Sequence, residues 1–259
     1  MRIPRYDGYI FDLDGTLYLG DTLLPGVAEV LATLRAEGRR VAFLSNNPTR
    51  TREQYVAKLR GMGLEAELGE VVNSSHVLVQ WLLAHAPGAT LFVCGEAPLI
   101  GELSAAGFPL SERAGAIDIV VASFDRTFTY HKLQVAFDAI RAGARLVATN
   151  PDRFCPVPGG GEPDAAAIIA AIEACTNTRC EVNVGKPSPI MARTVGAMLQ
   201  LPPERCLMVG DRLMTDIAMG AAAGMATALV LTGDSTRADV PGAPAQPTYV
   251  LERLSALLV

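Results

Sequence analysis

Short apolar runs alternate with longer amphipathic segments along almost the whole chain. The short runs, bounded by glycine, proline or polar residues, predict strands over 9–13, 40–44, 71–72, 91–94, 117–122, 145–149, 181–185, 206–209, 227–231 and 249–251. Apolar residues at helical spacing predict helices over 25–38, 51–62, 77–83, 99–106, 130–142, 164–175, 189–201 and 215–223. A loop is expected over 235–248, which is rich in proline, glycine and alanine. This alternation is typical of an α/β fold with a parallel sheet.

The first predicted strand ends in two carboxylates, in the sequence Asp12-Leu13-Asp14-Gly15-Thr16. Burying unpaired carboxylates beside apolar residues costs several kcal/mol. A divalent cation would offset that cost, and ligands of open parallel sheets bind beyond the carboxyl ends of strands. The alternative is an Asx-type turn, because aspartate and glycine are common turn residues. The motif alone leaves both interpretations open.

Three later strand ends carry polar groups of the same kind. Ser45-Asn46-Asn47 offers a hydroxyl and successive N–H groups to an anion, or else it caps and turns into the next helix. Lys186, in Gly-Lys-Pro-Ser-Pro, can reach a phosphate, although a lone lysine is more often solvated. Asp211 follows a buried strand, with Asp216 five residues on, and the alternative there is a capped helix start.

Composition narrows the class of protein. Half of the residues are hydrophobic (50%) and 19% are charged, so the chain can bury a core. The net charge of −5 and the scattered basic residues argue against nucleic acid as a partner. The longest apolar stretch, 217–231, is too short to span a membrane, and 1–15 lack the apolar run of a signal peptide. We expect a cytoplasmic protein with no membrane partner and five free cysteines.

Taken together, these motifs resemble a known family. DLDGT, SNN, GKPSP and GDRLMTDI are similar, in order, to the four motifs of the haloacid dehalogenase-like (HAD) phosphatases. DLDGTLYLGDTLLPG, FLSNNPTRTREQY, FTYHKL, ATNPD, GGG and LVLTG resemble the class IIA, NagD-like branch of sugar, aryl and nucleotide phosphatases. The likeness runs from about Tyr9 to Leu251. It implies a Rossmann-like HAD core with a parallel sheet and an inserted α/β cap of type C2.

The spacing of the motifs supports this branch. One helix and one strand fill the stretch from Asp12 to Ser45, which leaves little room for a cap there. The stretch from Ser45 to Lys186 holds at least three further strands. We therefore expect a discontinuous core over 1–80 and 181–259, with the cap over 81–180.

The resemblance also implies a mechanism, phosphate monoester hydrolysis through an aspartyl-phosphate. Asp12 would be the nucleophile and Asp14 the general acid and base. Mg²⁺ would bind Asp12, the backbone oxygen of Asp14 and Asp211, while Asp216 orients a water of the metal or Lys186. The phosphoryl group would contact Gly15, Thr16, Ser45, Asn46, Asn47 and Lys186.

The expected partner is a small-molecule phosphate ester, such as a sugar phosphate or 4-nitrophenyl phosphate. Asn150 and Asp152 in ATNPD resemble a family segment near the substrate, and 159–161 form a glycine loop nearby. The segment 162–167 departs from the family pattern; a carboxylate there would bind sugar hydroxyls or cap a helix. His131 is expected on the cap surface.

Two other functions stay open at the level of sequence: a phosphotransferase or mutase using the same aspartyl-phosphate, and a non-catalytic phosphometabolite-binding protein. The oligomeric state is not readable from the sequence. Cap surfaces in this group often associate, and this is the basis for expecting a homodimer.

Overall fold

The computed structural model describes residues 3–157 and 159–258. The chain packs as two compact units, and each is formed by separate stretches of sequence. Among the described residues, the first unit contains 3–45, 52–72 and 186–258, and the second contains 46–51 and 73–185.

The first unit is built on a six-stranded parallel sheet. In spatial order its strands are β14 (Tyr249–Leu251), β13 (Ala226–Val230), β12 (Cys206–Gly210), β1 (Gly8–Asp12), β4 (Arg40–Ser45) and β5 (Val71–Asn73). β1 lies in the middle, with Phe11 opposite Phe43 on one side and Val209 on the other. All five residues of β1 are buried, as expected for a central strand covered on both faces.

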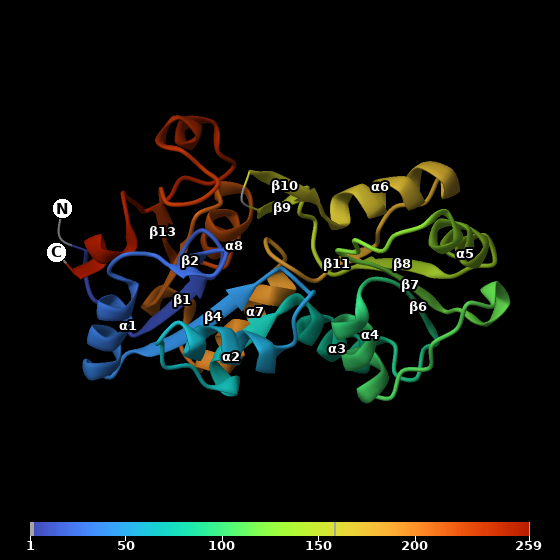
Figure 1. The fold of residues 1–259 in the computed structure, drawn as a ribbon, viewed down its shortest axis with the longest axis horizontal. Coiled ribbons are helices and arrows are strands. Elements are labelled where there is room, and N and C mark those ends of the chain that lie inside the picture. The colour runs from blue at the N-terminus through green and yellow to red at the C-terminus, as the bar shows by residue number, and fades with distance from the viewer. Residues whose placement is uncertain (1–2, 158, 259) are drawn as a thin grey trace. The chain divides into compact units, whose positions relative to one another are not determined.

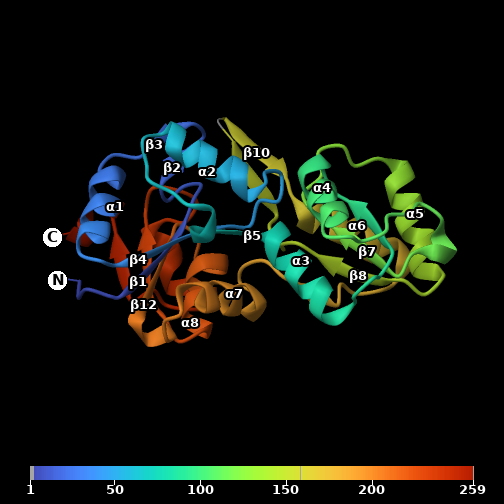
Figure 2. The same cartoon turned by 90° about the horizontal axis from the view of Figure 1, so that it is seen from below.

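Helices cover both faces of this sheet (Figure 2). α1 (Val27–Ala36) and α2 (Arg52–Gly61) lie on one face, and α7 (Pro189–Leu199) and α8 (Ala218–Ala222) lie on the other. The chain moves outward from β1 through β4 to β5, and in the opposite direction through β12, β13 and β14. Right-handed crossovers in opposite directions place their helices on opposite faces. The carboxyl ends of all six strands therefore share one edge.

Short elements complete the first unit. β2 (Tyr18–Leu19) and β3 (Thr22–Leu23) form an antiparallel hairpin soon after β1. A π-helical turn, Leu213–Ile217, joins β12 to α8. Short 3₁₀ segments are Leu68–Glu70, Pro203–Arg205, Arg237–Gly242 and Leu254–Leu258.

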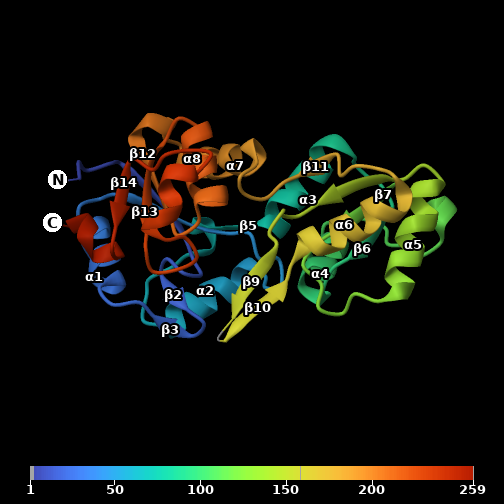
Figure 3. The same cartoon turned by 90° about the horizontal axis from the view of Figure 1, so that it is seen from above.

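The second unit has its own four-stranded parallel sheet. Its order is β11 (Val182–Asn183), β8 (Arg145–Ala148), β7 (Ile119–Ala122) and β6 (Leu91–Cys94). Figure 1 shows α5 (Tyr130–Arg141) and α6 (Ala165–Thr176) on one face, and α3 (Ser74–His85) and α4 (Ala97–Ala105) on the other. A 3₁₀ turn, Ala114–Ala116, precedes β7. An antiparallel hairpin of β9 (Phe154–Val157) and β10 (Gly160–Pro163) follows β8 (Figure 3).

The predicted alternation of strands and helices is confirmed, and the differences have local causes. The glycines at 159–161 are not a plain loop, because 160 and 161 pair with β9. The helix predicted over 77–83 begins at Ser74, because the Asn73 side chain caps it by accepting from His76 N. The segment 215–223 splits into the π turn and α8. The segment 235–248, predicted as a loop, contains the 3₁₀ turn Arg237–Gly242.

All five cysteines are free thiols, as predicted. In the part of the chain that the structure describes, every helix is too short or too polar to cross a lipid bilayer.

Candidate active site

Asp12 ends β1, and a tight turn follows it. Gly15 N donates to Tyr18 O at 2.8 Å, and Thr16 N donates to Leu13 O at 3.2 Å. The Thr16 hydroxyl donates to Asp12 Oδ2 at 3.3 Å. Gly15 has φ +86°, and a Cβ there would collide with the Asp211 carboxylate. The turn therefore requires glycine for both its conformation and the close approach of the next strand end.

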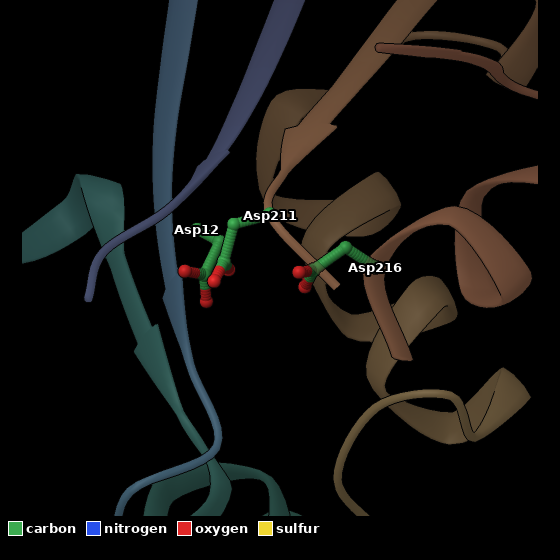
Figure 4. A group of neighbouring side chains, drawn as sticks. All are labelled: Asp12, Asp211 and Asp216. Atoms are coloured by element: carbon green, nitrogen blue, oxygen red, sulfur yellow. The ribbon is translucent and has the colours of Figure 1, made fainter. Parts of the chain in front are cut away.

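Three carboxylates converge at the carboxyl ends of β1 and β12 (Figure 4). Asp12, Asp211 and Asp216 each offer an oxygen within 4.8 Å of the others, and all three side chains are buried. Asp211 Oδ2 accepts from Asp234 N at 2.7 Å, whereas the buried Asp211 Oδ1 has no hydrogen-bond partner among the described residues. A buried oxygen without a partner is costly, and a hard cation satisfies such an oxygen. The donor set therefore fits a divalent metal ion.

Lys186 supplies the cation of this cluster in the protein itself. Its ammonium group donates to Asp12, and to Asp216 Oδ1 at 2.7 Å, and its side chain is only 3% exposed. When all three carboxylates are ionised, one ammonium group leaves two negative charges uncompensated. A divalent cation carries a charge of the same size and opposite sign, so the charge balance also favours a divalent metal ion at this site.

Burial and mutual repulsion disturb the titration of these groups. Burial raises the pKa of Asp12, and the charges of Asp216 and Asp211 raise it further against the opposing effect of Lys186. Burial and the charge of Asp216 raise the pKa of Asp211 to about 7. Burial opposes the charged form of Lys186, but Asp12 and Asp216 outweigh it and raise the pKa of the ammonium group. Lys186 is therefore a fixed positive charge at neutral pH.

Asp14 is the second carboxylate of the turn. The Tyr18 hydroxyl donates to Asp14 Oδ2 at 3.2 Å, and the Tyr18 side chain is fully buried. Burial and the nearby charge of Asp14 raise the pKa of Tyr18, so the phenol keeps its proton. Lys58 Nζ lies 3.9 Å from the centroid of the Tyr18 ring, a cation–π distance. The sequence analysis missed Tyr18, and the signal available was an aromatic residue four positions after Asp14.

Ser45 ends β4, the neighbour of β1 in the sheet. The hydroxyl groups of Ser45 and Tyr55 lie 3.1 Å apart, and both side chains are buried. Tyr55 lies on the buried face of α2. The structure places it as the residue that holds the Ser45 hydroxyl.

The remaining predicted site residues belong to the second unit. Asn46 Nδ2 donates to Asp152 Oδ2 at 2.9 Å, and Asn150 Nδ2 donates to the same oxygen at 3.2 Å. These three side chains are buried. Asn47 Oδ1 instead accepts from the Thr49 N–H at 2.9 Å and from its hydroxyl at 2.6 Å, which fixes the turn. The structure thus joins Asn46, Asn150 and Asp152 in one polar cluster within the second unit.

The segment that departs from the family pattern contributes to this cluster. Asp164 Oδ1 accepts from Asn150 Nδ2 at 2.9 Å and caps α6 by accepting from Ala165 N. Of the two roles considered for a carboxylate here, the helix cap is therefore observed. Glu162 Oε2 lies 3.5 Å from Arg126 Nη1 on the surface. His131 is exposed and pairs with Glu112, as expected for a surface residue.

The strand predicted before Lys186, β11, belongs to the second sheet, and Lys186 reaches Asp12 from the segment before α7. A parallel α/β unit with Asp12, Ser45 and Asp211 at its strand ends and this lysine beside them defines a class of hydrolase. The profile described as haloacid dehalogenase-like hydrolase matches residues 9–109, and one described as HAD-hydrolase-like matches 183–257. The chain belongs to the haloacid dehalogenase-like hydrolases. The predicted family and fold class are confirmed.

Individual relatives narrow the class. The sugar-phosphatase AraL of Bacillus subtilis is 38% identical, with 95% of this chain and 90% of that protein covered. The 4-nitrophenylphosphatase of Thermotoga maritima superposes with a TM-score of 0.92 at 38% identity, covering 97% and 96% of the two chains. NagD from E. coli gives 0.88 at 30% identity, covering 97% and 98%. The chain is a NagD-like HAD phosphatase, and the predicted enzyme class is confirmed.

Proposed function

We propose that the enzyme is a Mg²⁺-dependent phosphatase that hydrolyses small-molecule phosphate monoesters through an aspartyl-phosphate on Asp12. The observation that carries this proposal is the position of Asp12. Its buried carboxylate accepts a hydrogen bond from the Lys186 ammonium group and lies beside two further carboxylates. Sugar phosphates and 4-nitrophenyl phosphate are the proposed substrates, in line with the names of the relatives.

In the first step, a carboxylate oxygen of Asp12 attacks phosphorus in line with the leaving group. The bond from phosphorus to the ester oxygen breaks, and Asp14 gives its proton to that oxygen. In the second step, a water attacks phosphorus and Asp14 takes its proton. The bond between Asp12 and phosphorus then breaks, which releases inorganic phosphate and restores both carboxyl groups.

Asp12, the backbone oxygen of Asp14 and Asp211 would hold Mg²⁺, with Asp216 beside them and bonded to Lys186. When bound, the ion supplies positive charge that neutralises the phosphoryl oxygens during transfer. The unpartnered Asp211 Oδ1 is the observation that favours this assignment.

The phosphoryl oxygens need further donors that are held in place before the substrate arrives. Lys186 is buried and charged, and the Ser45 hydroxyl is fixed by Tyr55. We assign both to phosphoryl binding, with the N–H group of Asn46 as an additional donor. Gly15 and Thr16 were also predicted to contact the phosphoryl group, but their N–H groups donate within the turn, to Tyr18 O and Leu13 O. Donors held rigidly in a water-poor site stabilise developing charge without reorganisation.

We propose that the segment 81–180 is the cap that selects the leaving group. It lies within the second unit, which also contains 46–51, 73–80 and 181–185. The buried bonds among Asn46, Asn150 and Asp152 favour a supporting role for these residues over direct substrate contact. The homodimer and the cytoplasmic location stay predictions.

The test is a panel of hexose and pentose phosphates and 4-nitrophenyl phosphate, assayed for released inorganic phosphate with Mg²⁺ and with a chelator. We expect turnover with Mg²⁺ and none with the chelator. Transfer of the phosphoryl group to a second metabolite, with little inorganic phosphate, would instead indicate a phosphotransferase. Inactivity on every ester would contradict an enzymatic function.

A further inference from the structure

Tyr18 is anchored from three directions in the first unit. Its backbone oxygen accepts from Gly15 N at 2.8 Å, inside the turn that carries Asp14. Its hydroxyl donates to Asp14 Oδ2 at 3.2 Å. Lys58 Nζ, on α2, lies over the face of its ring, 3.9 Å from the ring centroid. Because Tyr18 begins β2 and is fully buried, its hydroxyl has little freedom to move away from Asp14.

Asp14 itself is less constrained by burial. Its side chain is partly exposed, whereas Asp12, Asp211 and Asp216 are buried. An aspartate side chain on a turn can occupy several rotamers, and proton transfer needs one orientation within hydrogen-bond reach of the leaving oxygen. The hydrogen bond from the Tyr18 hydroxyl to Asp14 Oδ2 favours the rotamers of Asp14 that keep this contact.

We propose that Tyr18 is a positioning residue for Asp14, and that Lys58 holds the Tyr18 ring in place for this role. This inference rests on the proposed acid–base function of Asp14. Tyr18 acts through Asp14 and does not touch the substrate. Removing the Tyr18 hydroxyl must therefore impair proton delivery to the leaving group and leave the binding of the phosphoryl group intact.

Leaving groups of different acidity separate these two effects. The sugar alkoxide released from a hexose 6-phosphate is strongly basic and needs the proton of Asp14. The 4-nitrophenolate ion is far less basic and leaves without full protonation. The quantity to compare is kcat/KM, because it reports the steps up to the first irreversible one, formation of the aspartyl-phosphate.

We expect Tyr18→Phe to lower kcat/KM for hexose 6-phosphate by roughly tenfold or more, the cost of losing a hydrogen bond to a charged group. For 4-nitrophenyl phosphate the loss is expected to be about threefold or less, because proton delivery contributes little there. Phenylalanine keeps the ring beneath Lys58, so the packing is preserved. Equal losses for the two esters, or no loss for either, would overturn the proposal.

Tyr55→Phe is the matched control. It also removes one buried tyrosine hydroxyl, but that hydroxyl contacts Ser45 and serves the phosphoryl group common to both esters. Its losses should be the same for both esters. Lys58→Met, which keeps the Tyr18 hydroxyl, should give a smaller loss in the same selective direction. It provides a second measurement if Tyr18→Phe folds poorly, and equal losses from it would count against the proposal.

Asp14→Asn distinguishes failure of this inference from failure of the proposed function. It should show the same selectivity for leaving groups as Tyr18→Phe, with a larger loss for hexose 6-phosphate. If Asp14→Asn shows the larger loss for hexose 6-phosphate and Tyr18→Phe does not, only the proposed role of Tyr18 is wrong. If Asp14→Asn affects both esters equally, the acid role of Asp14 is wrong, and the role of Tyr18 fails with it.

Discussion

The Lys186 ammonium group lies 2.7 Å from the carboxylate of Asp216, and both side chains are buried. The same ammonium group also donates to Asp12. Removing one member of a buried ion pair leaves an uncompensated charge, which costs about 3–5 kcal/mol. We therefore expect Lys186→Met to lower the free energy of unfolding by about 3 kcal/mol, measured by urea denaturation in the presence of a chelator.

The double variant Lys186→Met/Asp216→Asn tests the coupling itself. Removing both charges should restore part of the lost stability, because one fewer carboxylate is then left uncompensated. If the stability change of the double variant equals the sum of the changes in Lys186→Met and Asp216→Asn, the two residues are not energetically coupled. The double variant is expected to stay inactive, because Lys186 is also assigned to phosphoryl binding.

Asp211→Asn tests the metal assignment through stability and not through turnover. In wild type, Mg²⁺ at ten to a hundred times its Kd should raise the free energy of unfolding by about 1–3 kcal/mol. The variant should lose that increment, while its stability in chelator should equal or exceed that of wild type because carboxylate repulsion is relieved.

Asp138→Asn is the control, because Asp138 is a surface carboxylate of the second unit that accepts from Gln134. It should keep the full response to Mg²⁺. A full response in Asp211→Asn would contradict the assignment of Asp211 as a ligand.

Glu96 and Arg126 give a prediction about pH in the second unit. Two charge-assisted bonds, at 2.7 and 2.8 Å, lower the pKa of Glu96. The pKa of a glutamate in the unfolded chain is about 4.3. A carboxylate whose pKa is lower than this in the folded state stabilises the fold at any pH above about 4.3. This stabilisation is lost as the pH falls through the folded-state pKa. Arg126 is 49% exposed, so solvent screening limits the pair to about 1 kcal/mol.

Glu96→Gln should therefore destabilise the protein by up to about 1 kcal/mol at pH 7, and the difference from wild type should shrink between about pH 5 and pH 3. Thermal unfolding at several pH values measures it. Glu181→Gln is the comparison, because Glu181 pairs with Arg145 through one bond at 2.8 Å and both are over 40% exposed. Its effect should be smaller, and a Glu96→Gln effect that is unchanged at low pH would contradict the assigned pair.

The catalytic strand ends could be predicted from the sequence because they combine two independent signals. An apolar run predicts a buried strand, and a carboxylate directly after it falls at the edge where parallel strands bind ligands. Lys186 differs, because it follows the short, half-buried β11 of the second sheet. The resemblance of these strand-end motifs to the family predicted Asp12 and Asp211 at one metal site, and the structure brings their carboxylates together with Asp216. The long stretch between Ser45 and Lys186 likewise predicted additional strands, and four of them form the second sheet.

The supporting residues could not be predicted in the same way. Tyr18 and Tyr55 are consistent with ordinary core aromatics in the sequence. Their hydroxyl partners depend on the path of the turn after β1 and on how α2 packs against the end of β4, which the hydrophobic pattern does not specify. In their cluster, Asn46 joins Asn150 and Asp152, which lie more than a hundred positions further along the chain. The β9–β10 hairpin was missed because glycine and proline are weak strand formers, and its pairing depends on register.

The central claim, covalent catalysis by Asp12, is tested most directly by trapping the intermediate. Asp14→Asn should still be phosphorylated by 4-nitrophenyl phosphate, but it should hydrolyse the aspartyl-phosphate slowly, because the base for the second step is missing. Acid-quenched protein is digested and analysed by mass spectrometry. We predict one phosphoryl group on the peptide that contains Asp12, and none in Asp12→Asn. A turnover-competent enzyme with no phosphoryl group on Asp12, or near wild-type turnover by Asp12→Asn, would contradict the account.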